Sequence, residues 1–303
     1  MRDTFLMVKE ISVNLEHSWR AETRYPSVMG LLGLLRILWR ATFQPSFEKR
    51  SALMRERKRV RDFNRRDRSL DLRAVAQFRR LTPTTAPPQQ LVGGATDGGY
   101  LVPEIGLGGL SLFSPGVGHV VDFEYNFAER GHKVFLADAT VFEPPRPHDN
   151  FFFERKNLGS GKNEILLGPW IDSHSGPDEL VAVQMDIEGA EWEALTPYSV
   201  SDETLARVAW MVVEFHGTQN FWSESSAAQM ISVVDRMLEF FIPTAVHANN
   251  CAPGLDVGQY LLPSVFEVTF LNKSLQESAS PSNVVFPEFL NCPNRGPLTW
   301  PVA

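Results

Sequence analysis

The sequence predicts an α/β fold in which helices cover a mostly parallel β-sheet. After about residue 90, short apolar runs alternate with segments of helical spacing, which is the pattern of repeated β-α units. A turn with two glycines joins the first apolar run to the helical segment behind it. Two later runs, residues 133–138 and 180–186, each end on an aspartate. Ligands of parallel sheets bind beyond the carboxyl ends of the strands, so these ends are where a site is expected.

The individual elements follow from apolar periodicity and from the residues that break it. The predicted strands are residues 109–113, 133–138, 151–156, 180–185, 208–215, 244–247 and 265–271. The predicted helices are residues 120–130, 191–195 and 225–240. Such alternation favours parallel strands with helices on both faces of the sheet.

Composition narrows the function classes. The chain has 303 residues, 43% of them hydrophobic, which is enough to bury a substantial core. Its net charge of −7 argues against attraction of the whole surface to nucleic acid or to acidic membranes. The most apolar stretch, residues 28–43, is too short to span a bilayer, and the mixed composition of residues 1–16 leads us to expect no signal peptide. Cys251 and Cys292 suggest neither a zinc site nor a disulfide, so a cytoplasmic protein is expected.

The first 85 residues differ from the rest in composition and apolar spacing, and they predict a helical, basic N-terminal extension. Residues 49–80 hold 13 Lys or Arg against four Asp or Glu. The simplest interpretation is a solvated face that packs its few apolar residues on the main domain; a substrate-facing patch, an anionic surface contact and a partner site are alternatives. Residues 81–90 resemble a linker, and the extension is a candidate lid or an element of homo-oligomerisation. Residues 90–275 form the main domain, and 276–303 an irregular tail.

The glycine turn lies within "LFSPGVGHVVDFEYNFAERGHKVFLADAT", residues 112–140. Glycines at 116 and 118 allow close backbone approach to a ligand, and the helix N-terminus behind them offers free N–H groups. A dinucleotide fingerprint would have a third glycine where Val121 stands, which disfavours NAD. Asp138 follows about twenty residues on, where a carboxylate can accept ribose hydroxyls. A helix cap is the alternative role for Asp138.

Six short motifs resemble the FkbM-type S-adenosylmethionine-dependent methyltransferases: "DGGY", "SPGVGHVVDFE", "ADAT", "QMDIEGAEWEAL", "VVEFHG" and "HANN". The resemblance covers about residues 91–272. It implies a seven-stranded class I methyltransferase fold with S-adenosyl-L-methionine as cofactor, its methionine end over Gly116 and Gly118 and its ribose on Asp138. The implied cofactor residues are Asp97, Ser114, Gly116, Gly118, Glu124, Asp138, Thr140 and Asp186. Ala139 stands where the family's pattern has proline.

An acidic cluster is expected where neighbouring strands end. Asp186 and Glu214 each close a predicted strand, and His216 lies two residues beyond Glu214. Removing a proton from an alcohol needs a base near neutral pKa, for which His216 is the candidate, or a hard cation such as Mg²⁺. Asp186, Glu214 and Asn249 are the candidate oxygen ligands. The alternatives are a structural histidine, a metal-free Asp186 and a turn built by Asn249.

Together these observations predict an O-methyltransferase that acts on a hydroxyl of a sugar or another hydroxylated small molecule, with Asp186, Glu214 and His216 as catalytic residues. An RNA methyltransferase that uses the basic segment is the alternative enzyme, although no nucleic-acid module accompanies that segment. A non-catalytic scaffold that retains the fold is the alternative outside enzymes.

Overall fold

The computed structural model describes residues 72–94, 98–104, 109–222, 224–257 and 260–276, with residues 54, 57, 58, 60, 61, 280, 281, 298 and 300. The chain divides into two compact units, Met1–Glu48 and Lys49–Ala303, and all described residues belong to the second. Most of the predicted N-terminal extension, the apolar stretch 28–43, Asp97 and most of the predicted tail therefore lie outside the described residues.

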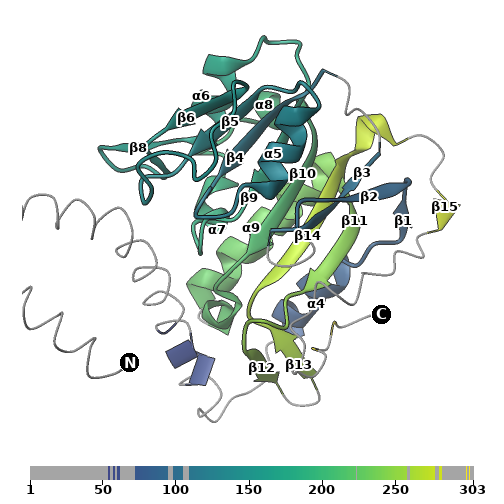
Figure 1. Cartoon of the computed structure of the whole chain (residues 1–303). Helices are drawn as coiled ribbons and strands as arrows, with labels where there is room; N and C mark the ends of the chain where they lie inside the picture. The colour runs from purple at the N-terminus through teal and green to yellow at the C-terminus, as the bar shows by residue number, and fades with distance from the viewer. Residues whose placement is uncertain are drawn as a thin grey trace, which may run out of the picture. The chain divides into compact units, whose positions relative to one another are not determined.

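A seven-stranded sheet forms the centre of this unit (Figure 1), and its strands run in the order β11-β14-β10-β9-β4-β5-β6. Their bounds are β4 Ser111–Pro115, β5 Val134–Ala137, β6 Phe151–Glu154, β9 Val181–Met185, β10 Val208–Phe215, β11 Phe241–Ala248 and β14 Phe266–Asn272. Only β14 among them runs antiparallel to its neighbours, β10 and β11. The predicted α/β class and mostly parallel sheet are confirmed, and all seven predicted strands are present.

The helices and small strands complete the unit. The helices are α4 Leu72–Arg80, α5 Asp122–Glu129, α6 Leu167–His174, α7 Glu191–Ala194, α8 Asp202–Ala206 and α9 Glu224–Phe240, with 3-10 turns η1 Thr218–Trp222 and η2 Lys273–Leu275. The small strands are β1 Thr85–Ala86, β2 Gln89–Val92, β3 Tyr100–Pro103, β7 Asn157–Leu158, β8 Glu164–Ile165, β12 Gly254–Val257, β13 Tyr260–Pro263 and β15 Ser280–Pro281. The predicted helices α5, α7 and α9 are confirmed.

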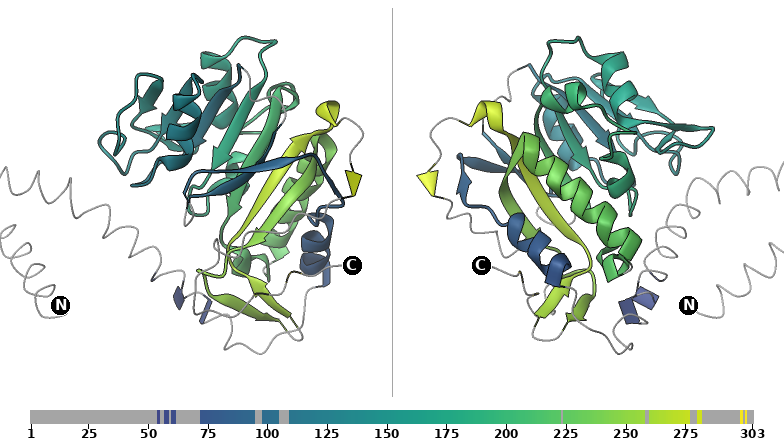
Figure 2. Two further views of the ribbon diagram at one scale, coloured as in Figure 1. Left: turned by 45° about the vertical axis from the view of Figure 1, so that its right-hand side comes forward. Right: turned by 180° about the vertical axis from the view of Figure 1, so that it is seen from behind.

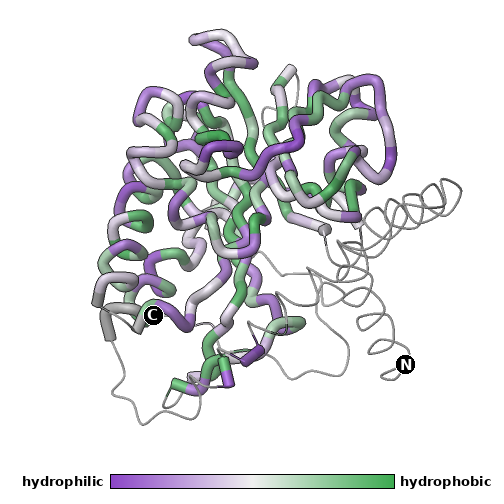
Figure 3. The backbone as a smooth tube through the Cα atoms, turned by 90° about the vertical axis from the view of Figure 1, so that its left-hand side faces the viewer, coloured by the Kyte–Doolittle hydropathy of each residue, from purple (hydrophilic) through white to green (hydrophobic). Residues whose placement is uncertain are grey.

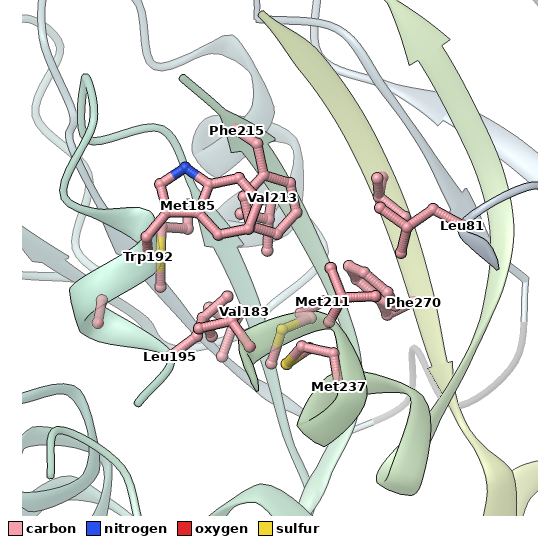
Figure 4. Packing of buried hydrophobic residues seen from close by; sticks show 14 of the residues in the cluster. Leu81, Val183, Met185, Trp192, Leu195, Met211, Val213, Phe215, Met237 and Phe270 are labelled. Atoms are coloured by element: carbon pink, nitrogen blue, oxygen red, sulfur yellow. The ribbon is translucent and has the colours of Figure 1, made fainter. Parts of the chain in front are cut away.

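Helices α4 and α6–α9 pack on one face of the sheet, and Figure 2 shows α4 beside α9 there. Trp192, Leu195 and Met237 from these helices meet Val213 and Phe215 of β10 in the interior (Figure 4). The opposite face is covered by α5 and by the β2-β3 hairpin. In Figure 3 the strands through the centre are hydrophobic along most of their length, as expected for a sheet covered on both faces.

The linker predicted at residues 81–90 is instead part of the folded unit. Phe78 of α4 and Leu81 are fully buried in the same core as the sheet, and β2 begins within this stretch. Val60 and Val75 of the basic segment are also buried there, as the packing interpretation of that segment requires. The proline- and threonine-rich composition does not reveal that apolar side chains of residues 72–90 are buried, and this burial stabilises the segment on the folded unit.

Two further expectations concern the cysteines and the membrane. Cys251 is disulfide-bonded, so the expectation that the cysteines stay unpaired is wrong, and the argument from cysteine usage to a reducing compartment loses its basis. Within the described ranges, no helix has the length and apolar character that crossing a membrane requires.

Candidate functional site

The candidate site lies at the carboxyl ends of β4, β5, β9 and β10. From β4 the chain proceeds through β5 to β6 on one side of the sheet, and then returns to β9 and β10 on the other side. The strand order thus reverses between β4 and β9, which is the position where open α/β sheets bind ligands. The glycine turn that follows β4 lies at this switch point.

The two glycines of this turn have different roles. Gly116 has φ +91°, and a Cβ there would overlap the main-chain carbonyl of Asp186 after β9. Its N–H donates to the Ala137 carbonyl at 2.9 Å, so the turn is tied to β5 as well. Gly118 has φ +54°, but a Cβ there would meet only the Gly116 carbonyl oxygen, at an ordinary contact distance of 3.9 Å. Close strand packing therefore requires glycine at 116, whereas the space beside Gly118 is available to a ligand.

The Asp138 carboxylate is buried at the end of β5 and already holds the surrounding loops. Its Oδ2 accepts from the Gly118 N–H at 2.9 Å, and its Oδ1 accepts from the Thr140 N–H at 2.6 Å and hydroxyl at 2.7 Å. The sequence left open whether Asp138 caps a helix or binds a ribose. No helix begins at Asp138, because β6 is the next element after β5, and the contacts of Asp138 hold two loops instead. A carboxylate with about four lone-pair sites can also accept hydrogen bonds from a ligand.

A pocket opens beside the glycine turn, lined by Gly98, Tyr100, Gly116, Val117, Gly118, His119, Val120, Asp122, Phe123, Glu124, Gln184 and Asp186. Four predicted cofactor residues are in this lining: Gly116, Gly118, Glu124 and Asp186. Asp138 and Thr140 adjoin it through the contact of Asp138 with Gly118. The structure therefore brings most of the predicted cofactor residues together.

Ser114 lies buried at the end of β4 and contacts two side chains. Its hydroxyl is 2.6 Å from Oε1 of Glu124 and 2.7 Å from Oε1 of Gln184. Burial raises the pKa of Glu124 to about 7, against the lowering effect of the Ser114 hydrogen bond. The Ser114 hydroxyl has one proton and can donate to only one of these two oxygens. All three groups are satisfied when Glu124 is protonated and donates to Ser114, and Ser114 donates to Gln184.

Four carboxylates surround His216 just beyond the end of β10. Its Nδ1 lies 3.0 Å from Oε1 of Glu191, and its Nε2 lies 3.8 Å from Oδ1 of Asp186 and 3.7 Å from Oε2 of Glu188. Oε1 of Glu214 is 4.0 Å from the same Nε2. The Glu191 side chain is fully buried and that of His216 is 13% exposed, whereas that of Glu188 is 48% exposed. The predicted proximity of Asp186, Glu214 and His216 is present.

Burial alone would lower the pKa of His216, but its acidic neighbours outweigh burial. The hydrogen bond and charge of Glu191, followed by the charges of Asp186 and Glu214, raise the pKa of His216 well above its usual range. The imidazole is therefore held as a cation at neutral pH when these four acids are its only ionic neighbours. A cation cannot accept the proton of an alcohol.

Glu191 fixes the loop that follows β9. Its Oε1 accepts from the N–H groups of Ile187 and Gly189, both at 3.1 Å. Glu188 instead has φ +57°, and it is the one non-glycine residue with positive φ in the described part of the chain. The Glu188 side chain points toward His216 within ion-pair distance.

Glu214 is anchored differently from the expected metal ligand set. Its Oε2 accepts from the Tyr100 hydroxyl at 3.4 Å, and its Oε1 accepts from Nδ2 of Asn249 at 3.0 Å. Oδ1 of Asn249, the atom predicted to bind a metal, accepts from the Cys251 N–H at 2.9 Å. The turn-building alternative for Asn249 is thus the one that the contacts favour. The group of potential ligand atoms within 4.8 Å of one another is Asp186, Glu188 and His216.

Comparison with known proteins gives no named relative: no protein-family model and no curated protein matches the chain. Among solved structures, a Methanococcus jannaschii fibrillarin pre-rRNA processing protein is similar over 55% of this chain and 67% of its own, with 9% identity and a TM-score of 0.32. The Burkholderia thailandensis 1,6-didemethyltoxoflavin-N1-methyltransferase was solved with 1,6-didemethyltoxoflavin and S-adenosylhomocysteine. It is similar over 55% of this chain and 72% of its own, with 16% identity and a TM-score of 0.28.

Likeness at this level carries no functional argument, so the fold class rests on the sheet itself. Seven strands, with a single reversed strand placed next to one edge and the glycine turn after the central β4, have the arrangement of the class I methyltransferase fold. The expectation of that fold is confirmed.

Proposed function

We propose that this chain is an S-adenosylmethionine-dependent methyltransferase that transfers a methyl group to a hydroxyl of a sugar or another hydroxylated small molecule, related to the FkbM-type enzymes. The observation that carries the proposal is the pocket at the switch point. There the uncrowded Gly118, the buried carboxylate of Asp138 and the acidic cluster around Asp186 meet at one edge of a class I sheet.

The residues of the pocket suit the cofactor's chemical groups. Gly118 leaves backbone space where the methionine part would lie, and α5 starts at Asp122 in the lining. Asp138 offers acceptor oxygens for ribose hydroxyls next to that space. Asp186 at the other side of the pocket supplies negative charge for a sulfonium. S-adenosylmethionine would bring the reactive methyl group to the acidic cluster.

Methyl transfer from a sulfonium is an in-line displacement. A lone pair of the acceptor oxygen forms the new C–O bond while the C–S bond breaks, and the electron pair of that bond remains on sulfur as a neutral thioether. The hydroxyl proton has to leave as the oxygen attacks. Side chains that hold the acceptor oxygen opposite sulfur and receive its proton therefore determine the rate.

The proton is better received by the carboxylates than by His216. The Nδ1 atom of His216 is engaged by Glu191 and its Nε2 atom faces three acids, so this imidazole supplies positive charge to the cluster. Asp186 lines the pocket directly, and Glu214 contacts the pocket residue Tyr100. We therefore assign proton removal to Asp186 or Glu214, and we assign to the positively charged His216 the role of offsetting the negative charge of these acids.

The test is calorimetric titration of the full chain with S-adenosylmethionine and S-adenosylhomocysteine. We expect micromolar binding that is at least tenfold weaker in Asp138→Ala and unchanged in Asp149→Ala, an exposed aspartate outside the pocket. Absence of binding by the folded wild-type chain, or equal binding by both variants, would overturn the cofactor site. An acceptor screen on hydroxylated and amine compounds, with Asp186→Asn as the inactive variant, then tests O-methylation.

A further inference from the structure

We propose that Asp186, Glu188 and His216 bind one divalent transition-metal ion. The proposal differs from the oxygen-only magnesium site expected from the sequence, because Asn249 uses its oxygen for a turn and Glu214 is held by Tyr100 and Asn249. It starts instead from the three side chains whose ligand atoms gather within 4.8 Å of one another.

The spacing of these atoms is close to that of a coordination shell. Nε2 of His216 lies 3.8 Å from Oδ1 of Asp186 and 3.7 Å from Oε2 of Glu188. Two ligands that each bind an ion at about 2.1 Å are separated by about 3.0–3.4 Å. The two distances from Nε2 exceed this range by a few tenths of an ångström, and Asp186 and Glu188 lie within 4.8 Å of each other. The half-exposed Glu188 side chain can make the inward movement that completes the shell.

The orientation of His216 matches that of a metal-binding imidazole. Nδ1 is held by Oε1 of Glu191 at 3.0 Å, which leaves Nε2 directed toward Asp186 and Glu188. Histidines that ligate metals donate their other ring N–H to a carboxylate or carbonyl, which fixes both tautomer and direction. Glu191 has this position without belonging to the ligand set.

The charge of the surroundings independently favours an additional cation. Glu191 is fully buried, and its second oxygen, Oε2, has no hydrogen-bond partner within the part of the chain that the structure describes. A buried carboxylate oxygen without a donor is costly unless positive charge lies close by. One imidazole faces the carboxylates of Asp186, Glu188, Glu191 and Glu214. A divalent ion at Nε2 would compensate this excess.

The donor set indicates the kind of ion. One imidazole and two carboxylates suit Zn²⁺ or Mn²⁺, whereas Mg²⁺ prefers oxygen ligands and retains water. Since Asp186 also lines the pocket, an ion at this place would acidify an acceptor hydroxyl there. That catalytic role rests on the proposed methyl transfer, but binding of the ion does not, so the two can fail separately.

The experiment titrates the chelator-treated full chain with Zn²⁺, Mn²⁺ or Mg²⁺ alone by calorimetry, and uses Co²⁺ absorption bands to report nitrogen ligation. Glu188→Gln removes a ligand charge at a half-exposed position. His216→Asn keeps a side-chain donor near the position of Nδ1 for Glu191 but lacks Nε2. Glu193→Gln is the matched control, because this exposed acid of α7 contacts Ser160 and lies outside the cluster.

We expect one Zn²⁺ or Mn²⁺ per chain, bound at least tenfold more weakly by Glu188→Gln and His216→Asn and equally well by Glu193→Gln. Near-ultraviolet circular dichroism tests whether each variant is folded. If a ligand variant does not fold, Asp186→Asn is used in its place. No stoichiometric ion, equal affinity in all variants, or tight Mg²⁺ binding that survives His216→Asn would overturn the proposal. Titration of the metal-free chain with S-adenosylmethionine tests the cofactor site separately.

Discussion

His216 and Glu191 are joined by a hydrogen bond of 3.0 Å between Nδ1 and Oε1, and the Glu191 side chain has no exposed surface. The same oxygen accepts from the N–H groups of Ile187 and Gly189. One carboxylate therefore links the loop after β9 to the residue that follows β10. Trp192 reinforces the link, because its Nε1–H donates to the His216 carbonyl at 2.8 Å.

Replacement of Glu191 should lower the free energy of unfolding more than replacement of Glu193, the other acid of α7. Glu191→Ala leaves two backbone N–H groups and a charged imidazole without their acceptor, which we expect to cost about 3–5 kcal/mol. Glu191→Gln keeps one oxygen acceptor and should cost about 1–3 kcal/mol. Urea denaturation followed by circular dichroism gives these free energies of unfolding.

Glu193→Ala is the control for Glu191, since Glu193 is exposed and contacts only the exposed Ser160 in the described structure. We expect a change within about 0.5 kcal/mol. If Glu191→Ala proved as mild as Glu193→Ala, the buried carboxylate would not hold the two loops together.

The glycine turn gives a prediction that separates folding from binding. Gly116→Ala places a methyl group onto the Asp186 carbonyl at φ +91° and should prevent stable folding. Gly118→Ala makes only an ordinary contact of 3.9 Å with the Gly116 carbonyl oxygen, so its cost is limited to the positive φ of +54°, about 1–2 kcal/mol. If the space beside Gly118 holds the cofactor, this second variant should remain folded but bind S-adenosylhomocysteine at least tenfold more weakly.

Thermal unfolding and calorimetry of the two variants provide the measurement. A Gly116→Ala protein with wild-type stability would show that the turn is not confined by β9. Full binding by Gly118→Ala would place the cofactor away from this turn.

Much of the fold is predictable because the sheet is strongly patterned. The apolar run of residues 208–215 matches β10, since a strand buried on both faces is apolar throughout. Helix α6 escaped prediction because Gly168 and Pro169 weaken its helical pattern. Helix α8 is only five residues long, although Ser201 caps it by accepting from the Thr204 N–H, a signal that the sequence does contain.

The site was predictable where strand ends determine it and unpredictable where burial does. The proximity of Asp186 to His216 follows from the parallel register of β9 and β10. The role of Glu191 does not, because glutamate is seldom fully buried and a helix-starting acid is usually solvated. The contact of Tyr100 with Glu214 depends on the β2-β3 hairpin, whose two strands were not among the predicted elements.

The raised pKa of Glu124 predicts a dependence of stability on pH. In the folded state this pKa is about 7, compared with the ordinary value of 4.5. Between these values the folded chain retains a proton that the unfolded chain releases, so stability falls as pH rises through this window. A shift of this size corresponds to roughly 3 kcal/mol, present at pH 4.5 and lost above pH 7.

Glu124→Gln removes this titration while keeping a neutral, hydrogen-bonding side chain next to Ser114. Relative to wild type, the variant should therefore gain about 2–3 kcal/mol in free energy of unfolding between pH 5 and pH 8. Denaturant curves at both pH values measure the difference. An equal effect at the two values would mean that Glu124 titrates normally in the folded chain.

Trp300 provides a final prediction about the C-terminal region, whose sequence has no regular pattern. Its ring makes edge contacts with Phe78 at 5.2 Å and Phe266 at 5.5 Å between centroids, and its Nε1–H donates to the Thr82 hydroxyl at 3.0 Å. A half-buried indole that joins α4 to β14 should contribute measurably to stability, so Trp300→Ala should cost about 2–3 kcal/mol. Trp300→Phe keeps the ring contacts and should lose only about 1 kcal/mol for the hydrogen bond. Equal losses in the two variants would assign the contribution to the hydrogen bond, and no loss in either would mean that the core is complete without Trp300.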